Sequence, residues 1–310
     1  MALTDEQVRQ YFDDGFLIVE DLLTADDLQP VMDEFEQVVD EWAEKLHGAG
    51  KIADKCADED FFHRLTKLEE QWPGAAPLVH NREQVRPALA RLWSSDRLLD
   101  VVERFLGPDI CGHPISVIRP KTPNTQLMTV PWHQDAAYFT PGMERTLQPV
   151  AWIPFIDASR ENGTLQVIRG GHRSGQVFRH RKECMVGHPK SWYVYIDEAD
   201  LPEGERVTCE MKVGSVLFHN TMMPHRSTEN YSDKIRWTAD LRWQRPGEPA
   251  GFDERPLVPM RKGDDPGFRL DLEEWSRGQL DDIQAYRGLA DDSFEYSCSG
   301  PWLDRWEEAA

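Results

Sequence analysis

The sequence of 310 residues lacks any apolar run near the roughly 20 residues that a membrane-spanning helix needs. Its first residues also lack the basic and apolar regions of a signal peptide. We therefore expect no membrane partner and a cytoplasmic location. Its five cysteines form no CxxC pair, so neither a disulfide framework nor a cysteine-based zinc site is expected. Internal repeats and low-complexity tracts are also missing.

Positive charge is scarce, because 35 Lys and Arg stand against 55 Asp and Glu, for a net charge of −20. This balance argues against nucleic-acid binding through phosphate neutralisation. The acidity concentrates in residues 1–60 and 245–310, whereas residues 61–244 are close to neutral. Hydrophobic residues make up 40% of the chain, which is enough to build a core. We expect a single domain over residues 1–310.

Residues 1–107 are predicted to be mainly helical. Thr4-Asp5-Glu6-Gln7 fits a capping box, and Gly15 is expected to end the first helix after Asp14. Residues 16–19 are predicted to form a buried strand. An apolar stripe over residues 28–46 predicts a long second helix, with Asp27 as its N-cap so that Pro30 falls in the first turn.

From residue 108 onward, short runs of β-branched and aromatic residues alternate with turn signals, which favours strands. Many short strands after a helical lead-in predict a jelly-roll core over residues 108–244, with the helices covering one outer face. Residues 245–310 are interpreted as a packed C-terminal extension. The expected strands are 113–119, 126–134, 149–156, 164–168, 192–196, 206–211, 215–219 and 235–243.

The segment Val130-Pro131-Trp132-His133-Gln134-Asp135 carries the sharpest local motif. On an extended strand, residues two apart point to the same face, so His133 and Asp135 can present an imidazole and a carboxylate to one point. His225 lies far enough along the chain to join them from another strand. Two histidines and one carboxylate leave open positions on an octahedral metal, as in non-heme Fe(II) oxygenases. Zinc accepts the same ligands, so the set alone does not select iron.

Two further residues near this motif can bind a carboxylate. Arg236 opens a predicted strand, where its guanidinium can make a bidentate contact with a buried carboxylate, and Ser227 can add a hydroxyl. His219 is interpreted as a core or hydrogen-bonded histidine rather than a further ligand.

These motifs together resemble the phytanoyl-CoA dioxygenase family of Fe(II)- and 2-oxoglutarate-dependent oxygenases. The resemblance covers about residues 10–243 and is carried by His133-x-Asp135, by His225-x-Ser227-x-x-Asn230 with Arg236, and by the stretch from Glu161-Asn162-Gly163-Thr164-Leu165 to Arg169-Gly170-Gly171-His172. In this last turn, the family's usual proline is replaced by Arg169.

The resemblance implies a double-stranded β-helix, a cupin-like jelly roll. It further implies that His133, Asp135 and His225 bind Fe(II), that Arg236 binds 2-oxoglutarate, and that dioxygen is the second cosubstrate. Gln126, Trp152 and Ser227 are implied as additional contacts to 2-oxoglutarate. Related halogenases have a small residue at the position of Asp135. The carboxylate of Asp135 therefore favours hydroxylation over halogenation.

The predicted activity is hydroxylation of an unactivated carbon in a small organic substrate, with succinate and CO2 as coproducts. Tyr138, Phe139 and Trp243 are candidates to line the substrate mouth, although a core role is an equal alternative for such aromatics. A natural product, an amino acid or a lipid-like molecule fits better than a phosphate-rich thioester, because the chain offers no basic patch. A zinc-dependent hydrolase or isomerase and a catalytically silent metal-binding module remain alternatives, and the oligomeric state is open.

Overall fold

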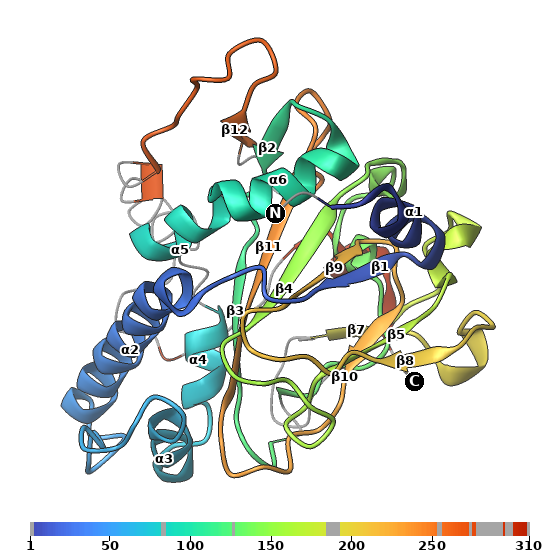
Figure 1. Cartoon of the computed structure of the whole chain (residues 1–310). Coiled ribbons are helices and arrows are strands. Elements are labelled where there is room, and N and C mark those ends of the chain that lie inside the picture. The colour runs from blue at the N-terminus through green and yellow to red at the C-terminus, as the bar shows by residue number, and fades with distance from the viewer. Residues whose placement is uncertain are drawn as a thin grey trace.

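The computed structural model describes residues 3–81, 85–125, 128–183, 193–252, 256–272, 275–276, 294 and 300–308 (Figure 1). Its helices are α1 (Asp5–Asp14), α2 (Ala25–Gly48), α3 (Arg64–Gln71), α4 (Ala75–Asn81), α5 (Pro87–Trp93), α6 (Asp96–Leu106) and α8 (Trp302–Arg305). Its strands are β1 (Phe16–Val19), β2 (Ile110–Gly112), β3 (Val117–Lys121), β4 (Pro149–Pro154), β5 (Leu165–Ile168), β6 (Arg181–Glu183), β7 (Tyr193–Tyr195), β8 (Arg206–Thr208), β9 (Val216–Asn220), β10 (His225–Ser227), β11 (Arg236–Gln244), β12 (Val258–Arg261) and β13 (Glu307–Glu308). Within these ranges, we find no helix with both the length and the apolar character for crossing a bilayer.

The first two helices begin at capping boxes. Thr4 accepts a hydrogen bond from the backbone N–H of Gln7, and Gly15 ends α1 at a φ of 84°, as predicted. The N-cap of α2 is Thr24 rather than Asp27, so that prediction was wrong. Asp27 occupies the third helical position, where its carboxylate accepts from the Thr24 backbone N–H at 2.8 Å. Pro30 consequently lies inside α2, beyond its first turn.

A buried carboxylate of α2 caps the neighbouring helix α5. Glu34 accepts hydrogen bonds from the backbone N–H groups of Ala88 at 2.5 Å and Leu89 at 3.0 Å, which have no partner within their own helix. A negative charge at a helix N-terminus is also favourable because of the helix dipole. Glu34 therefore joins the two helices that contribute most of the helical side of the core.

Glu34→Ala is expected to lower the free energy of unfolding by about 1–3 kcal/mol, because two buried donors lose their acceptor. Urea unfolding of the variant beside Glu36→Ala, an exposed acidic residue of the same helix, measures this difference. Equal unfolding midpoints for the two variants would show that the cap contributes nothing.

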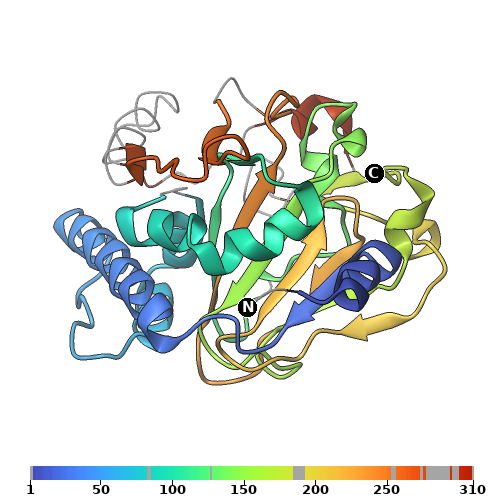
Figure 2. The ribbon, with the colours of Figure 1, turned by 45° about the horizontal axis from the view of Figure 1, so that its top comes forward.

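The strands form one large and two small sheets. The large sheet has the order β1-β9-β4-β11-β2-β12, with β3 also paired to β11, and all these pairings are antiparallel. One small sheet has the order β10-β5-β8, and the other β13-β6-β7. Figures 1 and 2 show α2, α4, α5 and α6 on one side of the large sheet. The helices were expected to cover one outer face of the jelly roll, and they do. The described strands form a two-layered jelly roll rather than a closed barrel.

Strand β11 separates the helical core from the interior between the sheets. Trp237, Ala239, Leu241 and Trp243 belong to the hydrophobic cluster shared with the helices. Since side chains alternate along a strand, Arg236, Thr238, Asp240 and Arg242 face the other way. The polar half of this buried strand therefore lies in the interior of the jelly roll.

Several predicted strands are confirmed, and others differ. Strands β4, β5, β9 and β11 lie within or close to the predicted ranges, whereas β3 begins four residues later than the predicted strand 113–119. The strand predicted at 126–134 is wrong, because among its described residues only an isolated bridge, between His133 and His225, has β pairing. Strand β10, which carries His225, was not predicted because it spans only three residues.

Candidate metal centre

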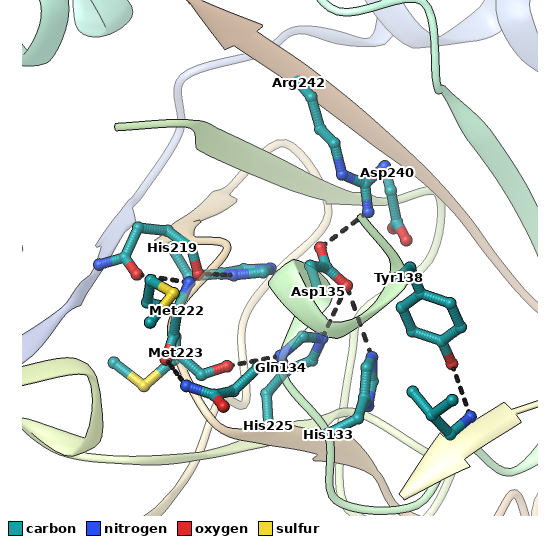
Figure 3. Close-up of polar contacts among 12 residues, drawn as sticks. His133, Gln134, Asp135, Tyr138, His219, Met222, Met223, His225, Asp240 and Arg242 are labelled. Carbon is teal, nitrogen blue, oxygen red and sulfur yellow. Dashed lines mark hydrogen bonds and ion pairs between the residues drawn. The ribbon is translucent and has the colours of Figure 1, made fainter. Parts of the chain in front are cut away.

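Three buried side chains from two segments far apart in the sequence meet in the interior of the jelly roll. The potential ligand atoms of His133, Asp135 and His225 all lie within 4.8 Å of one another. Asp135 Oδ1 is 3.5 Å from His133 Nε2 and 3.8 Å from His225 Nε2. Figure 3 shows the three side chains pointing toward one another. The predicted set of two histidines and one carboxylate is therefore brought together in space.

The backbone that builds this arrangement is not the extended strand that we expected. His133 and His225 exchange two backbone hydrogen bonds of 2.9 Å, which fixes the two ligand-bearing segments side by side. The chain then turns at once into a 3-10 helix, Asp135–Tyr138. His133 and Asp135 still point in one direction, because the backbone of Gln134 between them is extended, with a φ of −114° and a ψ of 136°.

The hydrogen bonds of the two histidines favour metal binding through Nε2. His133 Nδ1 lies 2.8 Å from the carbonyl oxygen of Pro131, and His225 Nδ1 lies 2.9 Å from that of Met223. A carbonyl only accepts, so each Nδ1 carries the proton and each Nε2 keeps its lone pair. His133 Nε2 is buried without a hydrogen-bond partner. An unpartnered nitrogen lone pair of this kind fits a metal cation.

A buried arginine fixes the charge and the orientation of Asp135. Arg242 Nη2 donates to Asp135 Oδ2 at 2.8 Å, which leaves Oδ1 facing the histidines (Figure 3). Burial alone would raise the pKa of Asp135, but Arg242 and the two imidazoles outweigh it and hold this pKa well below its usual range. Burial, with the neighbouring imidazoles, lowers the pKa of His225 well below its usual value. The site therefore presents a carboxylate at Asp135 and a neutral imidazole at His225, the forms that bind metals.

A pocket opens beside these residues, and His133 and His225 are part of its lining. One end of it has the groups of a carboxylate site. Arg236 is buried, lies 5.2 Å from the ring centre of Trp152, and its Nε has no hydrogen-bond partner. Burial lowers the pKa of Arg236 to about 9, so it is still a cation at neutral pH. Trp152 and Ser227, which were predicted as contacts to 2-oxoglutarate, line the same pocket.

Lys121 is a second cation at this end, which the sequence reasoning missed. Its Nζ donates to Ser227 Oγ at 2.8 Å and to the carbonyl oxygen of Thr228. Burial, reinforced by Arg236 and Arg119, lowers the pKa of Lys121 well below its usual value. The signal was present, because Arg119 and Lys121 are two apart, and basic residues at alternate positions of one strand point to the same face.

Two of the quoted motifs hold Lys121 in place. Asn230 Nδ2 donates to the Lys121 carbonyl oxygen at 2.8 Å. Gly163 has a φ of 88°, and a Cβ atom there would lie 2.5 Å from Lys121 Cδ and 2.8 Å from the Thr228 carbonyl oxygen. A side chain at position 163 would therefore displace the lysine from the pocket. The Asn-Gly turn and the asparagine after Ser227 thus shape the carboxylate site from outside it.

The remaining predicted residues lie at several different places in the structure. Gln126 lies outside the described residues. The Tyr138 ring packs edge-on against His133 at 5.7 Å, close to the metal ligands. Phe139 packs with Ile115 and Met143 in a separate hydrophobic cluster. Trp243 lies in the core between the sheet and the helices, so its predicted place at the substrate mouth is corrected. His219 is buried beside His225 and bonded to the Asn220 carbonyl oxygen, as expected for a structural histidine.

Comparison with solved structures confirms the fold class. A non-heme monooxygenase, ThoJ in its apo form, superposes with a TM-score of 0.57 at 23% identity, covering 91% of this chain and 95% of that one. The chain therefore shares the fold of the ThoJ structure, a jelly roll with mainly antiparallel strands and flanking helices. Such a level of identity establishes the fold, and the family follows from the sequence.

The model of the phytanoyl-CoA dioxygenase family matches residues 11–238, and the chain belongs to this family. The peroxisomal phytanoyl-CoA dioxygenase of Mus musculus is 28% identical over 240 residues, which cover 76% of this chain and 66% of that protein. A probable alpha-ketoglutarate-dependent hypophosphite dioxygenase of Stutzerimonas stutzeri is 27% identical over 73% of each chain. The predicted family is therefore confirmed, and both of these relatives are described as dioxygenases. The chain spans slightly less than two thirds of the mouse protein's length.

Proposed function

We propose that this chain is an Fe(II)- and 2-oxoglutarate-dependent dioxygenase that hydroxylates an unactivated carbon of a small organic molecule. The observation that carries the proposal is one pocket that joins a His-Asp-His set to a buried carboxylate site. His133, Asp135 and His225 would bind the metal. Arg236, Lys121 and Ser227, with Trp152 beside them, would bind the far carboxylate of 2-oxoglutarate, and Gln126 stays a predicted contact.

The metal, when bound, supplies the chemistry that activates dioxygen while 2-oxoglutarate is oxidatively decarboxylated to succinate and CO2. The residues of the chain bind and orient the reactants. Arg236 and Lys121 supply positive charge in a buried pocket, where a carboxylate is held more strongly than in water. Ser227 Oγ already accepts from Lys121 Nζ and from the Val130 N–H at 2.9 Å, so its own O–H is left to donate. Buried walls such as Trp152 and Leu165 exclude water from the reaction.

Fe(II)-dependent succinate release from 2-oxoglutarate tests the proposal. The reconstituted protein is expected to form succinate slowly without any added substrate, and only in the presence of dioxygen. Substitution of Zn(II) for Fe(II) is the control, because zinc fits the ligands but performs no redox chemistry. Metal-bound protein that forms no succinate would contradict the proposal, and turnover of a substrate with Zn(II) and without oxygen would favour a hydrolase.

The affinity for 2-oxoglutarate is expected to fall as the pH rises above the lowered pKa of Lys121. The pKa of Lys121 is lowered in the free protein, and a bound carboxylate would raise it again, so binding takes up a proton. Above the lowered pKa, the affinity should fall by up to about tenfold per pH unit. Titrations with 2-oxoglutarate at several pH values measure this slope, and Lys121→Gln should bind more weakly with a flatter profile. An identical slope in Lys121→Gln would assign the titration elsewhere.

The substrate and the compartment are further parts of the proposal. A small molecule is supported by the lining of the pocket, where charged and polar side chains lie among buried aromatic and aliphatic ones. A reducing compartment such as the cytoplasm is supported by the free thiols of Cys56, Cys111 and Cys209, although relatives named for phytanoyl-CoA are peroxisomal.

A further inference from the structure

One arginine in the pocket has no role in the site described so far. Arg119 lies on β3 two residues before Lys121, on the same face, and lines the pocket. Its Nε donates to Asp240 Oδ2 at 2.6 Å, and among the described residues this is its one hydrogen bond. Both Nη groups therefore keep their donors, and the side chain is 21% exposed. A guanidinium held by Nε presents its Nη edge as a fork for an oxyanion.

Asp240 holds this arginine from the opposite strand. It sits on β11, whose register places Thr238 opposite Arg119 and Asp240 opposite Val117. Burial would lower the pKa of Arg119, but Asp240 outweighs it and raises this pKa, so the guanidinium stays charged. Asp240 Oδ1 is buried without a partner, which leaves one oxygen beside the pocket to accept a hydrogen bond.

The charges of the pocket favour a further anion. Its lining has three cations, Arg119, Lys121 and Arg236, and one anion, Asp240. Asp135 is balanced by Arg242, and a divalent metal is balanced by the two carboxylates of 2-oxoglutarate. Positive charge therefore remains after metal and cosubstrate are counted, even with Lys121 neutral. In a chain with a net charge of −20, a buried positive excess of this kind needs a ligand to compensate it.

We propose that Arg119 binds a carboxylate group of the substrate, with Asp240 as the residue that positions it. This inference rests on the proposed function and specifies its substrate class: a small organic acid. The acid group would be held between β3 and β7, since Tyr193 of β7 lines the pocket together with Arg119 and Asp240. The carbon to be oxidised would then lie between this anchor and the metal ligands.

Trifluoroacetate is a suitable probe, because its 19F signal broadens when it binds near a paramagnetic metal. Protein loaded with Co(II) and saturated with 2-oxoglutarate is titrated with trifluoroacetate and, separately, with the uncharged trifluoroacetamide. Saturable broadening by the acid and none by the amide is expected. The same titration with diamagnetic Zn(II) shows that the broadening comes from the metal.

Arg119→Gln is expected to weaken trifluoroacetate binding by roughly 10- to 100-fold, the loss of a hydrogen bond to a charged group. Arg119→Lys keeps the charge beside Asp240 without the planar fork of the guanidinium. Its affinity for trifluoroacetate should lie between those of the wild type and Arg119→Gln. Arg104→Gln, which changes a surface pair with Asp5, is the matched control and should bind as the wild type does.

Three results would overturn the inference. The first is that the 19F signal of trifluoroacetate does not broaden in the loaded wild type. The second is that the signals of trifluoroacetate and trifluoroacetamide broaden equally. The third is that Arg119→Gln loses affinity for 2-oxoglutarate as strongly as for trifluoroacetate. The last result would assign Arg119 to the cosubstrate. Failure of Co(II) or 2-oxoglutarate to bind the wild type is seen before the probe is added, and it counts against the proposed function instead.

A separate observation concerns the C-terminal segment 300–308, which lies beyond the residues matched by the family model. Arg305 Nη1 donates to the carbonyl oxygens of Ala136 at 2.9 Å and Phe139 at 2.6 Å, and Trp306 Nε1 donates to that of Ala137 at 2.8 Å. These carbonyls belong to or directly follow the 3-10 helix that begins at Asp135. The segment therefore supplies donors to the carbonyl oxygens of Ala137 and Phe139, and a second donor to that of Ala136, which also accepts from the Phe139 N–H at 3.4 Å.

Ring packing and strand pairing hold the segment in place. Trp302 packs edge-on against Tyr138 at 5.3 Å, and Tyr138 in turn packs against His133. Strand β13 pairs in parallel with β6, with Glu307 opposite Arg181. Figure 2 shows this segment, in dark red, against the green segment that follows the metal ligands.

We infer that Arg305 is a positioning residue for Asp135, acting through the backbone of the 3-10 helix. Arg305→Met is expected to lower the Co(II) affinity by about 10-fold, the lower end for loss of an outer partner of a metal site, and to change the absorption bands of bound Co(II). Arg305→Lys should restore part of both. Arg179→Met, which breaks the exposed pair with Glu307, is the control and should change neither.

A merely structural role gives a different result. A folded Arg305→Met protein with the Co(II) affinity and absorption spectrum of the wild type would overturn the inference, even if its melting temperature were lower. If Arg305→Met does not fold, Trp306→Phe, which removes one donor and keeps the ring, provides the same comparison.

Discussion

Replacing His133 by Ala or Asp135 by Asn is expected to abolish 2-oxoglutarate-dependent turnover and to weaken Fe(II) binding severely. Each change removes one of three ligands whose donor atoms converge within 4.8 Å. The loss should exceed the roughly 10- to 100-fold that follows when only an outer partner of a metal ligand is removed. Metal titration followed by succinate release measures both effects.

The choice of substitution matters at Asp135. Alanine there would leave the buried guanidinium of Arg242 without its carboxylate, which is strongly destabilising. Asparagine keeps the shape and one acceptor and removes the charge, so it tests the ligand with less risk to the fold. His63→Gln, which changes an exposed histidine paired with Asp60, is the matched control. Full activity of both ligand variants would refute the metal assignment.

Arg236→Ala is expected to raise the KM for 2-oxoglutarate by about 100-fold, because a buried charge-assisted contact is worth up to about 3 kcal/mol. The affinity for Fe(II) should stay unchanged, since Arg236 contacts none of the three ligands and its one described hydrogen bond goes to Thr238 Oγ1 at 3.0 Å. Steady-state kinetics with varied 2-oxoglutarate and a separate metal titration distinguish these quantities.

Two variants sharpen this test. Arg236→Lys keeps the charge without the planar fork, so it should recover part of the affinity. Lys121→Gln should weaken 2-oxoglutarate binding on its own, because Lys121 and Arg236 line the same end of the pocket. An unchanged KM in Arg236→Ala would show that the cosubstrate carboxylate binds elsewhere.

Local sequence patterns predicted the parts of this fold that depend on neighbouring residues. The capping box at Thr4 and the strands at 16–19 and 235–243 were predicted from the sequence, because each is decided within one element. The ligand set was predicted from residue types and from the family resemblance. The division of the chain at residues 107 and 244 stays a prediction.

Features that depend on which strands pair could not be predicted from the sequence. His133 lies in an isolated bridge and Asp135 in a 3-10 helix, so the prediction of a strand at 126–134 was wrong. The side chains of His133 and Asp135 nevertheless converge. Likewise, Arg242 reaches Asp135 only because β11 crosses the interior at that point. Trp243 could have been excluded, because an odd number of positions separates it from Arg236 on one strand, and the two side chains must face opposite ways.

The most direct test of the account is an anaerobic titration of the metal-free protein with Fe(II) and then with 2-oxoglutarate, followed by visible absorption. We expect a charge-transfer band that appears only when both are present, because the His-Asp-His set and the carboxylate site open into one pocket. Arg236→Ala should need far more 2-oxoglutarate to give the same band. Fe(II)-bound protein that shows no band at any concentration of 2-oxoglutarate would contradict the central claim.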